Sequence, residues 1–484
     1  MAGVEHVISM EQLLSEKVQR TEAGDTSGGP NHPVIATEAT QKLTITVHEK
    51  ACTIPRDQRF KELRDAGANQ AETRPKIQKV VFFLRDQKNF QKYYEPRVVS
   101  LGPIHHGKPK YRPAEKYKLR FAKAFVSDSG KTDEYIYDHI EKNIAQLREY
   151  FDEELIKEYD NESLAWMLFV DGCAILQFIC FADENRSNEL KIKNDQSAFA
   201  QQDLFLLENQ LPYQLLKDLM KLSAKEKELE GHITSFISKH SMIPERAVFK
   251  DEDKKAPIHL LDLLRASLLG SADPTPKYGA PEVSTKDWQS FRNVLELKAA
   301  GIQLQPSKSS GLNDISFKRK WGFYPGILSL PPITVDDSTG PKFLNLIAYE
   351  MCSDFENGYG VTSYISFLDS LIDEASDVIE LRKARILGNL LGSDQEVALL
   401  FNEIGTDLVP NLRTYRTIRT QIQEYYDDKL MTWLSLFCHT HFSTPWTFLA
   451  FLGALLALAL SAVQTWYTVD SPPGPCDNFC KHHP

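Results

Sequence analysis

Residues 446–467 (WTFLAFLGALLALALSAVQTWY) form an uninterrupted run without Asp, Glu, Lys or Arg. As an α-helix, a run of this length extends about 33 Å, which matches a bilayer hydrocarbon core of about 30 Å. Trp446 opens the run, and Trp466 and Tyr467 close it, where amphipathic rings would meet the two membrane interfaces. The alternative is a buried core helix, but such helices seldom stay uncharged this long. We therefore predict a transmembrane helix with Trp446, Trp466 and Tyr467 as its membrane-interface residues.

The remaining composition is that of a water-soluble globular protein. Of 484 residues, 42% are hydrophobic and 25% are charged, and the net charge is −10. An acidic chain argues against nucleic-acid binding, which requires a clustered cationic surface. The most basic segment contains Lys116, Lys118, Arg120 and Lys123 at helical spacing among apolar residues. We interpret that segment as a solvated helix face.

Cysteine usage and the first residues predict the compartment. The opening MAGVEHVISMEQLLSEKVQR carries acidic residues and lacks the apolar core of a secretory signal. Five cysteines are scattered before the apolar run, which is typical of a reducing compartment: Cys52, Cys173, Cys180, Cys352 and Cys438. We predict a single-pass membrane protein, most of it cytosolic, at the plasma membrane. Cys438, eight residues before the run, is a candidate for S-acylation.

The tail supplies possible metal ligands in a C-x3-C-x-H-H pattern: Cys476, Cys480, His482 and His483. Such a short tail seldom closes a zinc site without a second element, so a disulfide or no role is favoured. We predict no metal and no cofactor for this chain.

The chain divides into four parts. Residues 1–75 are polar and turn-rich and predict a flexible N-terminal arm. Residues 76–435 predict a mostly helical soluble domain, with a division into two lobes near 270–286 left open, because that segment is rich in Pro, Gly and Ser. The transmembrane helix at 446–467 and a short tail at 468–484 follow.

Within the soluble domain, apolar spacing predicts an amphipathic helix over 134–156. Residues 203–220 predict another apolar helical stretch, bent or divided at Pro212. Residues 164–181 are apolar all round except Asp171 and Gln177, and the central Asp favours a core helix over a second membrane span. Residues 315–318 and 327–330 predict a small β-hairpin. The predicted fold class is therefore mainly α, with one hairpin and one transmembrane helix.

Polar groups at three places are candidate site residues. His105 and His106 are adjacent, so they point apart, and a hydrogen-bonding role in a loop is favoured over metal or acid–base work. Asp171 is either a perturbed acid or, more commonly, half of a buried ion pair. Glu208, with the two amides that follow it, fits buried hydrogen bonding near Pro212 better than a binding site. No G-x-S-x-G, HExxH or EF-hand pattern occurs.

Eight strings resemble, in the same order, the plant family called domain of unknown function 247. They are YEPRVVSLGPIHHG (94–107), DGCAIL (171–176), DLFLLENQLP (203–212), HLLDLLR (259–265), LELKAAG (295–301), LPPITVDDS (330–338), YISFLDSLI (364–372) and GSDQEV (392–397). The chain departs from the family upstream, where Val81-Phe82 stands in place of a frequent Val-Pro pair. Residues 1–75 have no clear counterpart.

The resemblance implies a plant, single-pass membrane protein of mainly helical fold, and it brings no known active site. Some grass relatives sit at self-incompatibility loci and look like pollen-side recognition determinants. We therefore predict a non-enzymatic, membrane-tethered component that recognises or signals to protein partners. Two alternatives stay open: a pollen-side self-incompatibility determinant, and an enzyme with an unrecognised pocket near His105, Asp171 and Glu208.

Overall fold

The structure is a computed structural model that describes residues 55–65, 76–186, 192–243, 256–270, 293–308, 311–319, 325–355, 359–411, 413–427 and 445–469. The chain separates into two compact units, Met1–Ala71 and Glu72–Pro484. In the first unit the described element is helix α2 (Arg56–Asp65), which is polar and largely exposed. Cys438 and the tail at 470–484 lie outside the described residues.

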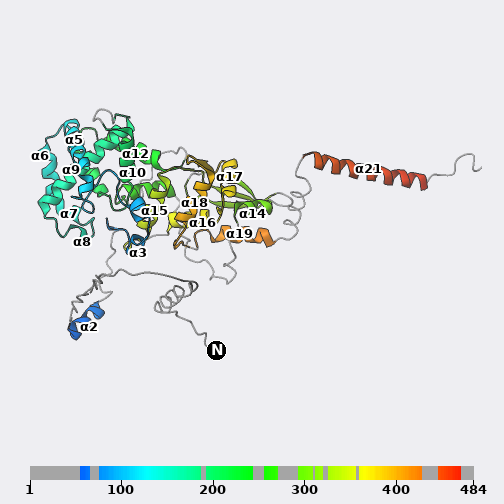
Figure 1. Cartoon of the computed structure of the whole chain (residues 1–484), viewed down its shortest axis with the longest axis horizontal. Coiled ribbons are helices and arrows are strands. Elements are labelled where there is room, and N and C mark those ends of the chain that lie inside the picture. The colour runs from blue at the N-terminus through cyan, green and yellow to red at the C-terminus, as the bar shows by residue number, and fades with distance from the viewer. Residues whose placement is uncertain are drawn as a thin grey trace, which may run out of the picture. The chain divides into compact units, whose positions relative to one another are not determined.

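Helix α9 (Asn161–Asp183) forms the centre of the N-terminal part of the second unit (Figure 1). The side chain of Asp160 caps it by accepting a hydrogen bond from the amide of Ser163 at 2.7 Å. Among the described elements, those that pack most extensively against it are α5 (Arg112–Ser129), α6 (Asp133–Lys142), α11 (Tyr213–Leu222) and α12 (Glu226–His240). Of its most apolar 18-residue window, 94% is buried, so the predicted core helix over 164–181 is confirmed.

The single helix predicted over 134–156 is wrong. The structure breaks it into α6, α7 (Ile144–Arg148) and α8 (Glu153–Ile156). The chain turns before α8 because Phe151 forms a parallel bridge with Ile77, whose amide donates to the carbonyl of Tyr150 at 2.7 Å. The apolar periodicity survives the breaks, since Phe151 and the isoleucines of these helices are buried. A long-range backbone pairing has overridden local helix propensity here.

Short helices complete this part of the unit. They are α3 (Phe82–Arg85), α4 (Phe90–Tyr94), the 3-10 helix η1 (Pro109–Tyr111) and α10 (Asn194–Asp203). Residues 95–108, between α4 and η1, form a loop without regular structure. We call residues 96–105 the buried loop, because it reaches from the surface into the core beside α9.

Two small sheets lie farther along the chain. Strands β2 (Ser316–Lys318) and β3 (Ile327–Leu330) pair antiparallel, which confirms the predicted hairpin. Strand β1 (Gln303–Pro306) adds to β3 in parallel, and β4 (Ile333–Val335) pairs in parallel with β5 (Leu387–Asn389). Strands β1, β4 and β5 were not predicted, because three or four residues outside a hairpin carry too little periodicity.

The helices of the C-terminal part are α13 (Leu260–Leu269), α14 (Val294–Ala299), α15 (Thr339–Glu350), α16 (Gly360–Asp369), α17 (Ala375–Lys383), α18 (Asp394–Ile404), α19 (Arg416–Asp427) and α21 (Pro445–Val469). Buried apolar side chains from Ile77 to Tyr425 form one continuous cluster. The fold is therefore mainly helical with two small sheets. The lobe boundary near 270–286 lies almost wholly outside the described residues and stays a prediction.

Candidate functional site

Residues 204–212 connect α10 to α11 as a fully buried segment without helical structure. The helical stretch predicted over 203–220 is therefore divided at Pro212, one of the two predicted alternatives, but the prediction of helix for 204–211 is wrong. Amide side chains take over backbone acceptors that a helix would use for itself. Nδ2 of Asn209 donates to the carbonyl of Asp203 at 2.9 Å, and Nε2 of Gln210 donates to the carbonyl of Leu206 at 2.8 Å. Helix α11 then starts directly after Pro212.

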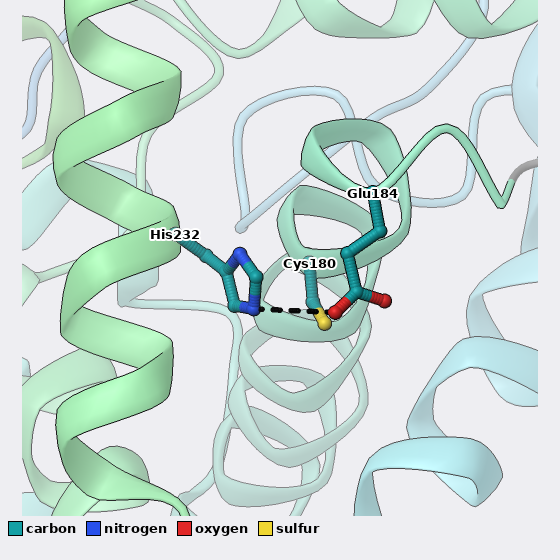
Figure 2. A group of neighbouring side chains, drawn as sticks. All are labelled: Cys180, Glu184 and His232. Carbon is teal, nitrogen blue, oxygen red and sulfur yellow. Dashed lines mark ion pairs between the residues drawn. The ribbon is translucent and has the colours of Figure 1, made fainter.

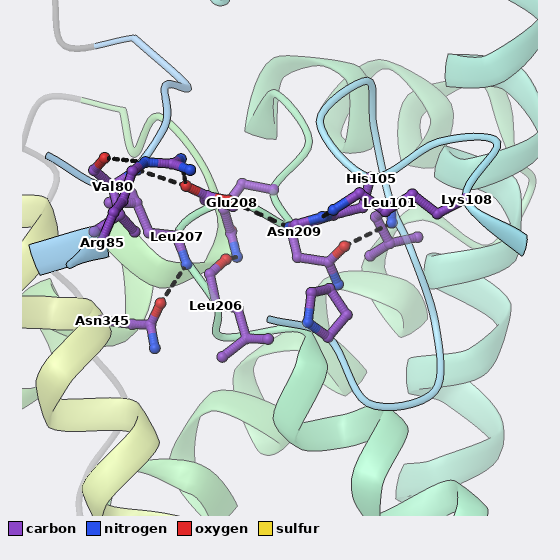
Figure 3. A network of polar contacts seen from close by, with 12 residues as sticks. Val80, Arg85, Leu101, His105, Lys108, Leu206, Leu207, Glu208, Asn209 and Asn345 are labelled. Atoms are coloured by element: carbon purple, nitrogen blue, oxygen red, sulfur yellow. Dashed lines mark hydrogen bonds and ion pairs between the residues drawn. The ribbon is translucent and has the colours of Figure 1, made fainter. Parts of the chain in front are cut away.

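Asn209 and Gln210 also bond to distant parts of the chain. Oδ1 of Asn209 accepts from the amide of Leu101 at 2.7 Å, and Oε1 of Gln210 accepts from the amide of Leu261 at 3.1 Å. Figure 3 shows Asn209 pointing at the buried loop. These contacts confirm the predicted buried hydrogen bonding of the two amides.

Glu208 binds three groups at the same place (Figure 3). Its Oε1 accepts from the amide of Val80 at 2.8 Å and pairs with the guanidinium of Arg85, and its Oε2 lies 3.4 Å from Nε2 of His105. That last distance is long for a hydrogen bond, so we describe it as an electrostatic contact. Burial favours the protonated carboxyl, but His105 and Arg85 outweigh burial and lower the pKa of Glu208. Glu208 is therefore held as a carboxylate.

The tautomer of His105 follows from its other nitrogen. Nζ of Lys108 lies 2.8 Å from Nδ1 of His105, and an ammonium can only donate, so Nδ1 accepts and Nε2 carries the proton. That proton points towards Glu208. His105 is buried while the neighbouring His106 is exposed, which confirms that the two rings point apart.

Asp171 on α9 is buried and paired, as predicted. Its Oδ1 lies 2.6 Å from Nζ of Lys118 on α5, and its Oδ2 accepts from the amide of Gly102 at 2.9 Å. Burial opposes the charge of Lys118, but Asp171 and Glu115 outweigh it and raise the pKa of this lysine. The interpretation of this basic segment as a solvated face is therefore wrong for Lys118, although Lys116, Arg120 and Lys123 are exposed. Helical spacing cannot reveal which lysine meets a buried acid.

Asp203 is a residue that the sequence reasoning missed. Its carboxylate accepts from the consecutive amides of Arg97, Val98 and Val99 at 2.8, 2.7 and 2.9 Å. Burial raises the pKa of Asp203 to about 6, although the three donors favour the ionised form. An Asp just ahead of an apolar run resembles a helix signal, so its position does not reveal that it binds a distant loop.

These groups share one structural task. Asp203, Asn209 and Asp171 bind successive stretches of the buried loop, and Glu208 contacts His105 at its end. The structure brings His105 and Glu208 together, whereas Asp171 contacts Gly102 and Lys118. Fixing a loop that lacks regular structure requires a partner for each buried amide, and these side chains supply them.

An apolar cavity of about 120 Å³ lies beside this network, among α5, α9, α10 and residues 98–101. Apart from Lys118 and Gln196 its lining is almost entirely apolar. None of His105, Asp171 and Glu208 lines it, so this cavity is not the pocket that the enzyme alternative requires.

Helix α21 differs from α9 in burial although both are long and apolar enough to cross a membrane. None of the apolar window of α21 is buried, against 94% for α9. Trp446, Trp466 and Tyr467 are 78%, 70% and 72% exposed. α21 is therefore a candidate membrane span by length, composition and exposure.

Comparisons of the sequence with known proteins place the chain in a plant family. The sequence profile of the DUF247 family, described as "Plant protein of unknown function", matches residues 77–460. The chain is 26% identical over 416 residues to "UPF0481 protein At3g47200" of Arabidopsis thaliana, an alignment that covers 77% of this chain and 82% of that protein.

A second Arabidopsis thaliana protein, "Putative UPF0481 protein At3g02645", is 28% identical over 182 residues, which cover 37% of this chain and 33% of that protein. No solved structure matches the chain. The profile spans the buried loop, the network that fixes it and most of α21. This chain belongs to the DUF247 family of plant proteins of unknown function.

Proposed function

We propose that this chain is a membrane-anchored, non-enzymatic component that recognises protein partners through its helical body. The observation that carries the anchoring is the exposure of α21, since an apolar helix of this length is stable in water only when something covers it. A bilayer covers such a surface. Lipid tails offer no hydrogen bonds to the backbone, but a helix forms its backbone hydrogen bonds internally. The aromatic residues at both ends suit the two interfaces.

We propose further that the body lies in the cytosol, at the plasma membrane. The described cysteines support a reducing compartment, because Cys173, Cys180 and Cys352 are free and buried. Adding protease to sealed membrane vesicles whose cytosolic face points outward tests this orientation. Digestion of the body from the cytosolic side supports the proposal, and protection of the body contradicts it.

The recognition role rests on how polar and aromatic groups are distributed. The buried acids and amides beside the buried loop bind protein groups, which supports a structural role for them. By contrast, Trp166 on α9 is 54% exposed, and its ring lies 6.0 Å from Tyr137 and 5.6 Å from Phe169. Exposed tryptophan is typical of the residues that dominate protein–protein binding energy.

Cross-linking on intact membranes tests the recognition role. We expect the parent chain to cross-link a defined partner, and Trp166→Ala to reduce the yield at least tenfold while the melting temperature stays within a few degrees. Leu399→Ala is the matched control, because Leu399 is a comparably exposed side chain on α18. Equal yields from both variants contradict recognition through Trp166. A turnover that disappears with His105→Ala in a folded chain would favour the enzyme alternative instead.

A further inference from the structure

Cys180 and Glu184 lie one helical turn apart at the C-terminal end of α9, and His232 faces them from α12 (Figure 2). A ligand atom of each residue lies within 4.8 Å of the other two. Nε2 of His232 is 3.6 Å from Oε1 of Glu184. Ligand atoms of a tetrahedral zinc ion, with bonds of about 2.0–2.3 Å, lie roughly 3.3–3.8 Å apart. The three groups therefore need shifts of only about 1 Å to share one ion.

The ring of His232 is oriented for this role. Its Nδ1 lies 2.8 Å from Oδ2 of Asp183, while its buried Nε2 has no hydrogen-bond partner among the described residues. The other oxygen of Asp183, Oδ1, accepts from Oγ of Ser235 and from Nζ of Lys239, both at 2.6 Å. With Oδ2 of Asp183 accepting from Nδ1–H, the Nε2 lone pair of His232 is directed towards Cys180 and Glu184. Metal-binding histidines are commonly held by a carboxylate in this way.

A fourth ligand is available on α12. Glu228 stands one turn before His232 on the same face, with its Oε1 3.9 Å from Nε2 of the histidine. Two cations compete for the acids: Nη1 of Arg186 lies 2.8 Å from Oε2 of Glu184, and Nζ of Lys225 lies 3.9 Å from Oε1 of Glu228. Arg186 contacts only Oε2 of Glu184 in this pair, so Oε1 can still bind an ion. The contact between Lys225 and Glu228 is too long to fix the position of Glu228.

The three side chains differ in exposure to solvent, and the Cys180 sulfur is the most deeply buried. Cys180 is buried, whereas the side chains of Glu184 and Glu228 are 32% and 49% exposed, so an ion has a path from solvent. Zinc binds a cysteine as its thiolate, so binding would release the thiol proton of Cys180 to solvent. One sulfur, one imidazole nitrogen and carboxylate oxygens suit zinc.

We propose that Cys180, Glu184 and His232 bind one Zn²⁺ ion, which Glu228 or a water completes, and that Asp183 orients His232. The ion would tie the end of α9 to α12 and add a metal-dependent contribution to the stability of the body. The proposal does not depend on membrane anchoring or on partner recognition.

Zinc titration of the purified full chain in detergent, after chelator treatment, tests the proposal. Cys476→Ser and Cys480→Ser are combined as the background, so that the tail cannot supply a thiolate. We expect one Zn²⁺ per chain in this background and a higher melting temperature with zinc than without it. Cys180→Ala and His232→Ala should each weaken binding at least 100-fold, and Asp183→Asn roughly 10–100-fold.

Cys173→Ala on the same helix is the matched control, because it also removes one buried sulfur and should leave zinc affinity unchanged. Cobalt loading of the background chain keeps the proposal testable if Cys180→Ala fails to fold. A thiolate-to-cobalt charge-transfer band supports the site. Absence of bound metal, equal zinc affinity after Cys180→Ala, or bound cobalt without that band overturns the proposal.

Discussion

Lys118 of α5 and Asp171 of α9 form an ion pair with a 2.6 Å separation between Nζ and Oδ1, and both side chains are buried. The same two residues hold the buried loop, since Nζ of Lys118 donates to the carbonyl of Ser100 at 3.0 Å and Asp171 accepts from the amide of Gly102. One pair thus joins two helices and a loop. Removing Lys118 leaves the carboxylate of Asp171 buried without its counter-charge, whereas removing Asp171 leaves Lys118 paired with Glu115.

Lys118→Met should therefore lower the free energy of unfolding by about 3–5 kcal/mol, because the carboxylate of Asp171 stays buried. Urea unfolding of the purified chain in detergent measures this loss. Lys116→Met is the matched control, since Lys116 is exposed on the same helix, and it should change stability by no more than about 0.5 kcal/mol. Similar losses for the two variants would mean that the buried pair contributes little.

Asn209→Ala should lower the free energy of unfolding by about 1–3 kcal/mol, because the amide of Leu101 loses its acceptor inside the core. Chemical denaturation checks the size of the loss. Asn402→Ala removes an amide at an exposed position of α18 and should cost far less. If Asn209→Ala melts like the parent but loses a ligand or a turnover, the structural role assigned to this residue is wrong.

Substitutions at two glycines of the same region distinguish the cost of backbone strain from the cost of a steric clash. Gly102 and Gly107 both adopt left-handed φ angles, +65° and +76°. A Cβ on Gly102 would lie 3.0 Å from the carbonyl oxygen of Gln210, whereas one on Gly107 meets nothing within 4 Å. Gly107→Ala should cost only the strain, about 1–2 kcal/mol, and Gly102→Ala should cost clearly more. Equal melting temperatures for the two variants would contradict the close contact between the buried loop and residues 204–212.

Acid should destabilise the body partly through His259, the N-cap of α13. This ring is fully buried, and burial lowers its pKa to about 3, against about 6.5 in the unfolded chain. Between these values the unfolded chain binds more protons, so stability is complete above about pH 6.5 and is lost as the pH falls towards 3. The expected loss from His259 at pH 5 is about 2 kcal/mol.

His259→Asn keeps a capping side chain but cannot titrate, so it should flatten the pH dependence of unfolding between pH 6.5 and 5. His139→Asn on α6 is the control and should leave the slope unchanged. Unfolding curves at successive pH values measure both slopes. An unchanged slope after His259→Asn would show that this ring titrates normally in the folded chain.

Much of the fold follows from local patterns. The all-apolar run around Asp171 predicted a core helix and a paired acid, and the hairpin ending at Leu330 was also predicted correctly. The predictions failed where distant groups compete with local ones. Phe151 pairs with Ile77 and interrupts the helix predicted over 134–156. Asn209 binds a backbone carbonyl within the helical stretch predicted over 203–220.

Side-chain pairing between distant segments had no sequence signal. Lys118 looked like its exposed neighbours, and the approach of His232 on α12 to Cys180 on α9 depends on helix packing that no spacing reveals. The family resemblance was confirmed, whereas the recognition role, the pollen-side alternative and the acylation of Cys438 stay predictions. Function was the part least accessible from sequence, because Asp171 and Glu208, the acids of the enzyme alternative, bind the protein's own backbone.

The most direct test of the anchoring is alkaline carbonate extraction of membranes that contain the full chain or a chain ending at residue 444. An embedded α21 resists extraction, because transferring its exposed apolar surface into water is strongly unfavourable. We expect the full chain in the membrane pellet and the shortened chain in the supernatant. Recovery of the full chain in the supernatant, or retention of the shortened chain in the pellet, would contradict anchoring by α21.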